Sequence, residues 1–248
     1  MYDLTQLSLQ DITEIGVALR TLGKEADSLE LVADRCVQHL YYSLLDPVTN
    51  KPACVLVRFF RTVPYTLLPP SLQTSVQTAI AQPPELIPAD LKCLTLLGTV
   101  GDRPEWCDRI ASVGHQVIPL ASEQSVSQIP MISQLIKAFD LEISCVLSPA
   151  PNLLMALERK TCNVFHVPIA TDSEFIPSQE QFVKPYGIKS VVGFGGMLAS
   201  GDLFSTILFS KVEISEPTAH LFKTLPLNIK MSLSALNRSQ LFSQTVAV

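Results

Sequence analysis

Residues 182–211 read FVKPYGIKSVVGFGGMLASGDLFSTILFSK, and no other stretch says more about the fold. Two apolar runs, at 188–194 and 203–209, are separated by a Ser-Gly-Asp turn. Gly201 tolerates a positive φ without steric cost, and Ile, Val and Phe in the flanking runs favour strands. The stretch therefore predicts a β-hairpin.

Helices are expected on both sides of this hairpin. Before it, Ser178 with Gln181 predicts the start of a brief helix that Pro185 stops. After it, Ser215 as N-cap and Pro217 in the first turn predict a long C-terminal helix, which Pro226 should kink because proline removes a backbone hydrogen bond. The apolar face of that helix is formed by Leu221, Leu225, Ile229, Leu233 and Leu236.

The N-terminal half predicts two helices and two strands. Ser8 and Asp11 form a capping box before a helix with Ile12, Ile15 and Leu19 on one face, and a longer helix follows over 29–44. Strands are expected at 53–61 and 91–100, with a short helical piece at 72–80 between them.

Residues 103–160 are expected to form a helical insert. The segment EWCDRIASVGHQVIPL is polar and gives no clear period, and Pro130 then fits the first turn of a helix. A further helix is expected over 151–160, and a short strand over 162–167.

Composition indicates a globular protein of 248 residues, with 47% hydrophobic residues, 17% charged residues and a net charge of −5. No Lys/Arg cluster could follow a phosphate backbone, so direct binding of nucleic acid is not expected. The chain has no signal-peptide pattern and no apolar run of the ~18 residues that a membrane span needs, which predicts a cytoplasmic protein without membrane contact. Its six cysteines form no CxxC pair and suit a reducing compartment, where most would be small core residues.

The order of predicted elements, together with particular phrases, resembles the GAF domain family, the small-molecule sensor module of bacterial signalling proteins. The similarity rests on NVFHVP from 163, GIKSV from 187 and GDLFSTILFS from 201. It covers roughly residues 10–236, so the chain is expected to be one GAF-like domain over 1–248, with 103–160 as an enlarged insert. Other phrases, such as GHQVIPL and FGGMLASGDLF, are similar to sensory regions of cyanobacterial and other bacterial signalling proteins.

The resemblance implies an α+β fold: an antiparallel sheet flanked by N- and C-terminal helices that carry dimer contacts, with a ligand pocket on the other face. It implies no particular ligand. Bilin-binding relatives attach the chromophore to a cysteine usually followed by histidine, whereas the nearest cysteine here, Cys107, is followed by Asp108. The pattern of cyclic-nucleotide-binding relatives is not found either, so the cofactor stays unassigned.

Two short motifs were weighed against structural explanations. The glycines at 193, 195 and 196 lack the third glycine of a dinucleotide loop and lead toward another strand, so a bulge or a close packing contact is the favoured interpretation. Cys162 and His166 are four residues apart, which on a strand places their α-carbons ~13 Å apart, too far for one metal ion.

The candidate ligand-binding residues lie mainly in the insert. Trp106 could shield a ligand that Arg109, Ser112 and His115 hydrogen-bond, although Arg109 and His115 could equally cap helices or make surface pairs. Three further candidates flank the hairpin, where the alternative for each is a core or sheet-surface position: His166, Tyr186 and Phe194.

These residues predict a non-catalytic sensory or regulatory domain. It would bind a small molecule or a partner protein and signal through its terminal helices, as a homodimer. Two alternatives stay open: an interaction scaffold without a ligand, and an enzyme that uses the region of Arg109 and His115.

Overall fold

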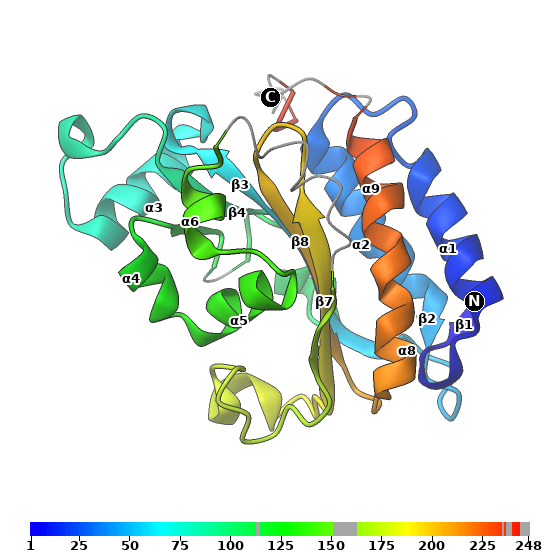
Figure 1. The fold of residues 1–248 in the computed structure, drawn as a ribbon. Coiled ribbons are helices and arrows are strands. Elements are labelled where there is room, and N and C mark those ends of the chain that lie inside the picture. Colours follow the sequence, from blue (N-terminus) through cyan, green and yellow to red (C-terminus); the bar gives the residue numbers. More distant parts are fainter. Residues whose placement is uncertain (113–114, 151–162, 235, 237–239, 244–248) are drawn as a thin grey trace.

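The protein is described by a computed structural model over residues 1–112, 115–150, 163–234, 236 and 240–243. It has a mixed α+β architecture built on a six-stranded antiparallel sheet, in which the strand order is β5-β4-β3-β8-β7-β6. Figure 1 shows helices on both faces of this sheet. The strands are β3 (Cys54–Pro64), β4 (Lys92–Gly101), β5 (Val117–Pro119), β6 (Phe165–Val167), β7 (Ser190–Met197) and β8 (Leu203–Ser210).

The hairpin predicted from residues 182–211 is confirmed. Strands β7 and β8 pair antiparallel over their whole length, from Ser190 opposite Ser210 to Met197 opposite Leu203. Gly201 has a φ of 75°, as the turn between the two strands requires. The hairpin continues the sheet through β3, which pairs with β8.

Helices from both ends of the chain cover one face of the sheet, and α1 packs on α9 while α2 lies on β3 and β4 (Figure 1). The capping box at Ser8 and Asp11 is present, and Ser215 caps the C-terminal segment by accepting from the Thr218 amide. The expected interruption of the last helix is also present, since a 3₁₀ turn precedes a second helix with Pro226 in its first turn. The helices of this layer are α1 (Leu9–Thr21), α2 (Leu29–Ser43), α8 (Glu216–Leu221) and α9 (Leu225–Leu233).

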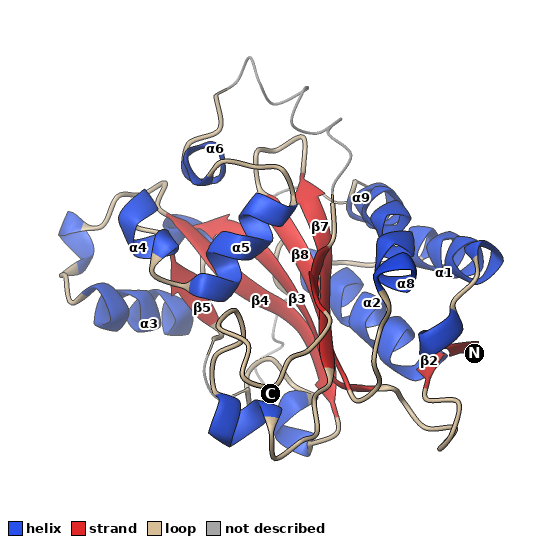
Figure 2. Cartoon of the chain, turned by 60° about the horizontal axis from the view of Figure 1, so that its bottom comes forward, coloured by secondary structure: helices blue, strands red, loops and turns tan. Residues whose placement is uncertain are grey.

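The opposite face is covered by shorter elements from the middle of the chain, which Figure 2 shows on the other side of the strands from α1 and α9. Helix α3 (Pro70–Ile80) is different: it lies beside the edge strand β5 and contributes Leu72 and Val76 to the core on the side of α1, α2 and α9. Two very short strands, β1 (Tyr2–Asp3) and β2 (Leu44–Leu45), pair separately from the main sheet. The remaining helices are α4 (Glu123–Ser127), α5 (Pro130–Ala138) and α6 (Ile143–Leu147).

Alternating side chains of the central strands feed two separate apolar cores. Phe59 and Phe204 point to the α1/α2/α9 side, where their rings stack with centroids 5.8 Å apart. Leu56, Phe60 and Ile207 belong to the core on the other side. Full burial of each such side chain contributes roughly 1.5–3 kcal/mol, so both layers are held to the sheet mainly by apolar contact.

Two parts of the middle region differ from the sequence expectations, and two further expectations fall outside the described residues. Ser178 does not cap a helix: it has a φ of 60° and leads into a π-helical turn at Gln179–Val183. Strand β5 was not expected, because three residues at a sheet edge carry little periodic signal. The predicted helix over 151–160, and the start of the predicted strand at 162, lie outside the described residues.

Two expectations from composition can be compared with the described part of the chain. There, no helix is long and apolar enough to cross a membrane. The five described cysteines are free thiols, of which Cys36, Cys54 and Cys93 are buried as small core residues.

Candidate functional site

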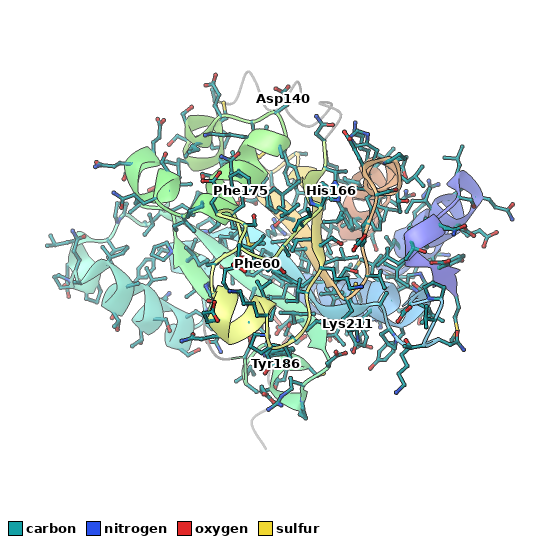
Figure 3. All side chains as sticks on the ribbon, turned by 90° about the horizontal axis from the view of Figure 1, so that it is seen from below. Phe60, Asp140, His166, Phe175, Tyr186 and Lys211 are labelled. Atoms are coloured by element: carbon teal, nitrogen blue, oxygen red, sulfur yellow. The ribbon has the colours of Figure 1, made fainter. Side chains whose placement is uncertain are left out.

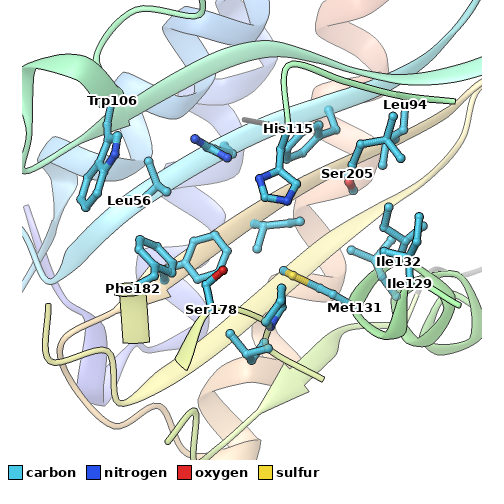
Figure 4. Close-up of a pocket in the computed structure, with 18 of the residues that line it drawn as sticks. Leu56, Leu94, Trp106, His115, Ile129, Met131, Ile132, Ser178, Phe182 and Ser205 are labelled. Atoms are coloured by element: carbon cyan, nitrogen blue, oxygen red, sulfur yellow. The ribbon is translucent and has the colours of Figure 1, made fainter. Parts of the chain in front are cut away.

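A cavity of about 300 Å³ lies on the face of the sheet opposite α1, α2 and α9. Its floor is formed by β3 and β8, and its walls by Trp106, by α5 with the residue before it, and by residues 176–182. In Figure 4, Trp106 and His115 face Ser178 and Phe182 across the cavity, and Ile129 and Ile132 close another side. This volume is at the lower end of the ~300–1,000 Å³ that is usual for small-molecule pockets.

Most of the lining is apolar. The sheet, α5 and the π-helical turn all contribute hydrocarbon side chains, so an apolar molecule would bury most of its surface here. These residues are Leu56, Phe60, Leu94, Ile118, Ile129, Met131, Ile132, Leu135, Ile176, Pro177, Phe182, Leu203, Ile207 and Phe209.

Arg58 is the strongest polar group of the cavity. It is only 9% exposed, in the middle of β3 opposite Ile207. Its Nη2 donates to the Ser112 hydroxyl at 2.9 Å, while its Nε has no hydrogen-bond partner among the described residues. Burial lowers the pKa of Arg58 to about 10, so the guanidinium stays protonated at neutral pH.

His115 lines the cavity near Arg58. Its backbone has a φ of 58°, the left-handed region that non-glycine residues seldom adopt. Burial, and secondly the charge of Arg58, lower the pKa of His115, so the imidazole is neutral at pH 7. The remaining polar lining residues are Ser178, Gln181 and Ser205, and the described lining contains no carboxylate.

The loop that carries Ser112 is fixed by one glutamine. The side-chain amide of Gln116 donates to the carbonyl oxygens of Arg109, Ile110 and Ser112. Trp106 is anchored independently, because its carbonyl oxygen accepts from the Thr99 hydroxyl at 2.9 Å. The segment between β4 and β5 is therefore held at Trp106 by Thr99 of β4 and at Ser112 by Gln116, the residue before β5.

The structure brings four of the seven predicted residues to this region. Trp106 and His115 line the cavity, and Ser112 contacts it through Arg58. Tyr186 packs edge-on against Trp106, with ring centroids 4.7 Å apart, and supports that wall without lining the cavity. Trp106 and Tyr186 thus form one aromatic cluster with Phe182.

The other three predicted residues lie elsewhere. Arg109 forms a largely buried ion pair with Glu30 of α2 at 2.6 Å and lies over the ring of Phe242, so it does not line the cavity. His166 lies on the side of β6 toward the C-terminal helices, where its Nε2 contacts the Ile214 carbonyl oxygen at 2.9 Å (Figure 3). Phe194 points into the helix-side core against Phe222, so the expectation that it faces the pocket is wrong.

Several cavity residues had no place in the sequence predictions, above all Arg58. One sequence signal for Arg58 was present. In the segment CVLVRFFR, from Cys54 to Arg61, the two arginines are the only charged residues, and all the other side chains are apolar. Ser205 and Gln181 gave no such signal, because polar residues near strand and helix ends are common.

The glycine motif has a structural explanation. Gly193 and Gly195 lie within β7, and a Cβ on Gly195 would come 2.1 Å from the Phe204 carbonyl oxygen, which confirms the close-packing interpretation. Cys162 lies outside the described residues, and among those described no group of three or more His, Cys, Asp or Glu could hold a metal ion.

Comparisons with known proteins add no relative to this picture. The chain matches no protein-family profile and no curated protein sequence.

Proposed function

We propose that this protein is a sensory or regulatory domain of the GAF type that binds a small molecule in the cavity and transmits the binding through its terminal helices. The observation that carries the proposal is the division of the molecule by its sheet, with a small apolar cavity on one face and α1, α2 and α9 on the other. This is the arrangement that the resemblance to GAF domains implies.

A direct contact between α2 and the sheet supports transmission. A Cβ on Gly98 of β4 would lie 2.7 Å from the backbone of Ala33, so helix and strand touch without side chains between them. At the end of the same strand, the Tyr41 hydroxyl of α2 donates to Asp102 at 2.6 Å. The turn with Trp106 follows directly, so a shift of the Trp106 wall on ligand binding would move Asp102 and α2 together.

Binding is tested with 1-octanol as a neutral apolar probe. We expect the wild type and Ser205→Ala to bind it in calorimetry, and Ser205→Phe to bind at least tenfold more weakly, because the phenyl ring fills the cavity. Hydrogen exchange of α2 and α9 amides should slow on binding in the wild type and not in Ser205→Phe. Native mass spectrometry of the purified protein should also show a retained small molecule.

Two experimental outcomes would contradict different parts of the proposal. If the wild type binds neither octanol nor its charged eight-carbon analogues octanoate and octylamine, and retains no molecule, the cavity is not a ligand site and the proposal is overturned. If octanol binds without any change in the exchange of α2 and α9, the sensory part of the proposal fails and the binding part stands.

We further propose that the helix layer forms a homodimer. Apolar side chains are exposed on the two helices that pack together there, namely Val17 on α1 and Leu227 and Met231 on α9. A second copy of the same helix pair would bury these side chains in a four-helix arrangement.

The dimer is tested by sedimentation. We expect the wild type to sediment as a dimer, and Val17→Glu with Met231→Glu to raise the dimer dissociation constant at least tenfold, since both charges would be buried. Val48→Glu, at an 89% exposed turn position between β2 and β3, is the matched control and should stay dimeric. A monomeric wild type, or a double variant that still dimerises as tightly, would contradict this interface and leave a partner protein as the output.

A further inference from the structure

Strand β3 carries two buried arginines that point to opposite faces of the sheet. Arg61, 4% exposed, is paired with Asp202, whose carboxylate lies 2.9 Å from its Nη2 and also pairs with Lys92. Arg58, 9% exposed, has only the neutral hydroxyl of Ser112 as a hydrogen-bond acceptor among the described residues. The same type of side chain thus has an anionic partner on one face and none described on the other.

The lack of a described anionic partner makes the burial of Arg58 energetically unfavourable. Removing a charged group from water is unfavourable by several kcal/mol unless an opposite charge and hydrogen bonds replace its hydration. The Ser112 hydroxyl replaces part of the hydrogen bonding that water would give to Arg58, but it supplies no opposite charge. Because Arg58 stays protonated at neutral pH, the cavity wall presents a positive charge for which the described residues supply no counter-charge.

The surroundings of Arg58 restrict what an anionic partner could be. The described lining contains no aspartate or glutamate, and His115, the other titratable group, is neutral at pH 7. One guanidinium therefore matches a single negative charge. The rest of the lining is mainly hydrocarbon, and 300 Å³ is the liquid volume of about ten water molecules.

We propose that the natural ligand is a small amphipathic carboxylate of about ten non-hydrogen atoms, whose carboxylate pairs with Arg58 and whose apolar part lies against Leu135, Ile207 and Phe209. A planar guanidinium binds a carboxylate through short, charge-assisted hydrogen bonds, and the neutral His115 ring can add another. This inference rests on the proposed function of the cavity as a ligand site. It adds the chemical class of the ligand and the residue that selects it.

The test compares three probes with one eight-carbon chain, octanoate, 1-octanol and octylamine, below their aggregation concentrations. In calorimetry at neutral pH, the wild type should bind octanoate about 10- to 100-fold more tightly than octanol, which is the effect of hydrogen bonds to a charged group. Octylamine should bind more weakly than octanol, because its ammonium group would meet the charge of Arg58.

Two variants assign the preference to Arg58. Arg58→Met removes the guanidinium and keeps an apolar stem, so octanoate should lose its advantage while octanol still binds. Arg103→Met removes an equal charge from an exposed ion pair with Glu105 and should keep the advantage of octanoate. If Arg58→Met does not fold, the order of the three probes on the wild type still decides the matter.

The outcomes separate this inference from the proposal beneath it. Octanol binding as tightly as octanoate, or Arg58→Met keeping the preference, would overturn the carboxylate inference and leave the cavity as a ligand site. No binding of any of the three probes would overturn both.

Discussion

Replacing Asp202 with asparagine lowers the free energy of unfolding by about 3–5 kcal/mol, the usual effect of removing one partner from a buried ion pair. Asp202 is 2% exposed, directly before β8, and links this strand to two others, since it pairs with Arg61 of β3 and Lys92 of β4. Ser200 donates to the same carboxylate at 2.7 Å. The amide of asparagine keeps the shape of the side chain and leaves two largely buried cations without their counter-charge.

The effect depends on pH in a defined direction. Burial alone would raise the pKa of Asp202, but the hydrogen bond and charge of Lys92, with the bonds from Ser200 and Arg61, outweigh burial and lower it. As the pH falls, the Asp202 carboxylate is therefore protonated at a higher pH in the unfolded chain than in the folded protein. The stabilisation by Asp202 is present above the unfolded pKa of about 3.9 and is lost as the pH falls through the lower folded pKa.

Urea unfolding at neutral pH and at pH 3–4 measures both effects. Asp172→Asn is the control, because its carboxylate, 74% exposed, forms only a surface pair with Lys184 and should change stability little. A loss of less than about 1 kcal/mol for Asp202→Asn at neutral pH would show that the ion cluster does not hold these strands together.

The sequence predicted an element well where the residues that determine it are close together in the chain. The capping box of Ser8 and Asp11, the cap at Ser215 and the Gly201 turn each combine a side chain with its own neighbouring backbone, so the chain alone specifies them. Strand β5 depends on pairing with a separate strand, because Val117 lies opposite Thr95 of β4. The π-helical turn at Gln179–Val183 depends on the preceding loop, where the Gln179 side chain donates to the carbonyl oxygens of Ala170 and Ile176, and no regular sequence pattern indicates those bonds.

The site was predicted less well than the fold, and for a related reason. Trp106 and His115 were found because aromatic and titratable residues are unusual in a polar insert. The side of the sheet on which a strand residue points depends on register, so Phe194 was placed on the wrong face. Arg58 was missed because its distinguishing feature is the lack of a described counter-charge on its face of the sheet. That lack is visible only when the positions of β3, β8 and residues 104–116 in space are known.

Replacing Gly195 with alanine should lower the free energy of unfolding by about 2–3 kcal/mol, as expected for overpacking against atoms that cannot move aside. A Cβ at this position would lie 2.1 Å from the Phe204 carbonyl oxygen and 2.8 Å from the Ser205 α-carbon. Both belong to the backbone of β8, so the hairpin itself must open to admit the methyl group. The same strand β8 forms part of the cavity floor through Ser205 and Ile207, and octanol binding should weaken in parallel.

Gly193, two residues earlier on β7, provides a matched control for the same substitution. There a Cβ would lie 3.3 Å from side-chain atoms of Leu135 and Phe165, which can yield, and Gly193→Ala should change stability by less than about 1 kcal/mol. Equal effects of the two substitutions in urea unfolding would contradict the close approach of β7 and β8. A much larger loss of stability for Gly195→Ala would mean that Gly195 allows β7 and β8 to approach each other. If the glycine only made room for a cofactor phosphate, adding a methyl group would not be expected to destabilise the protein.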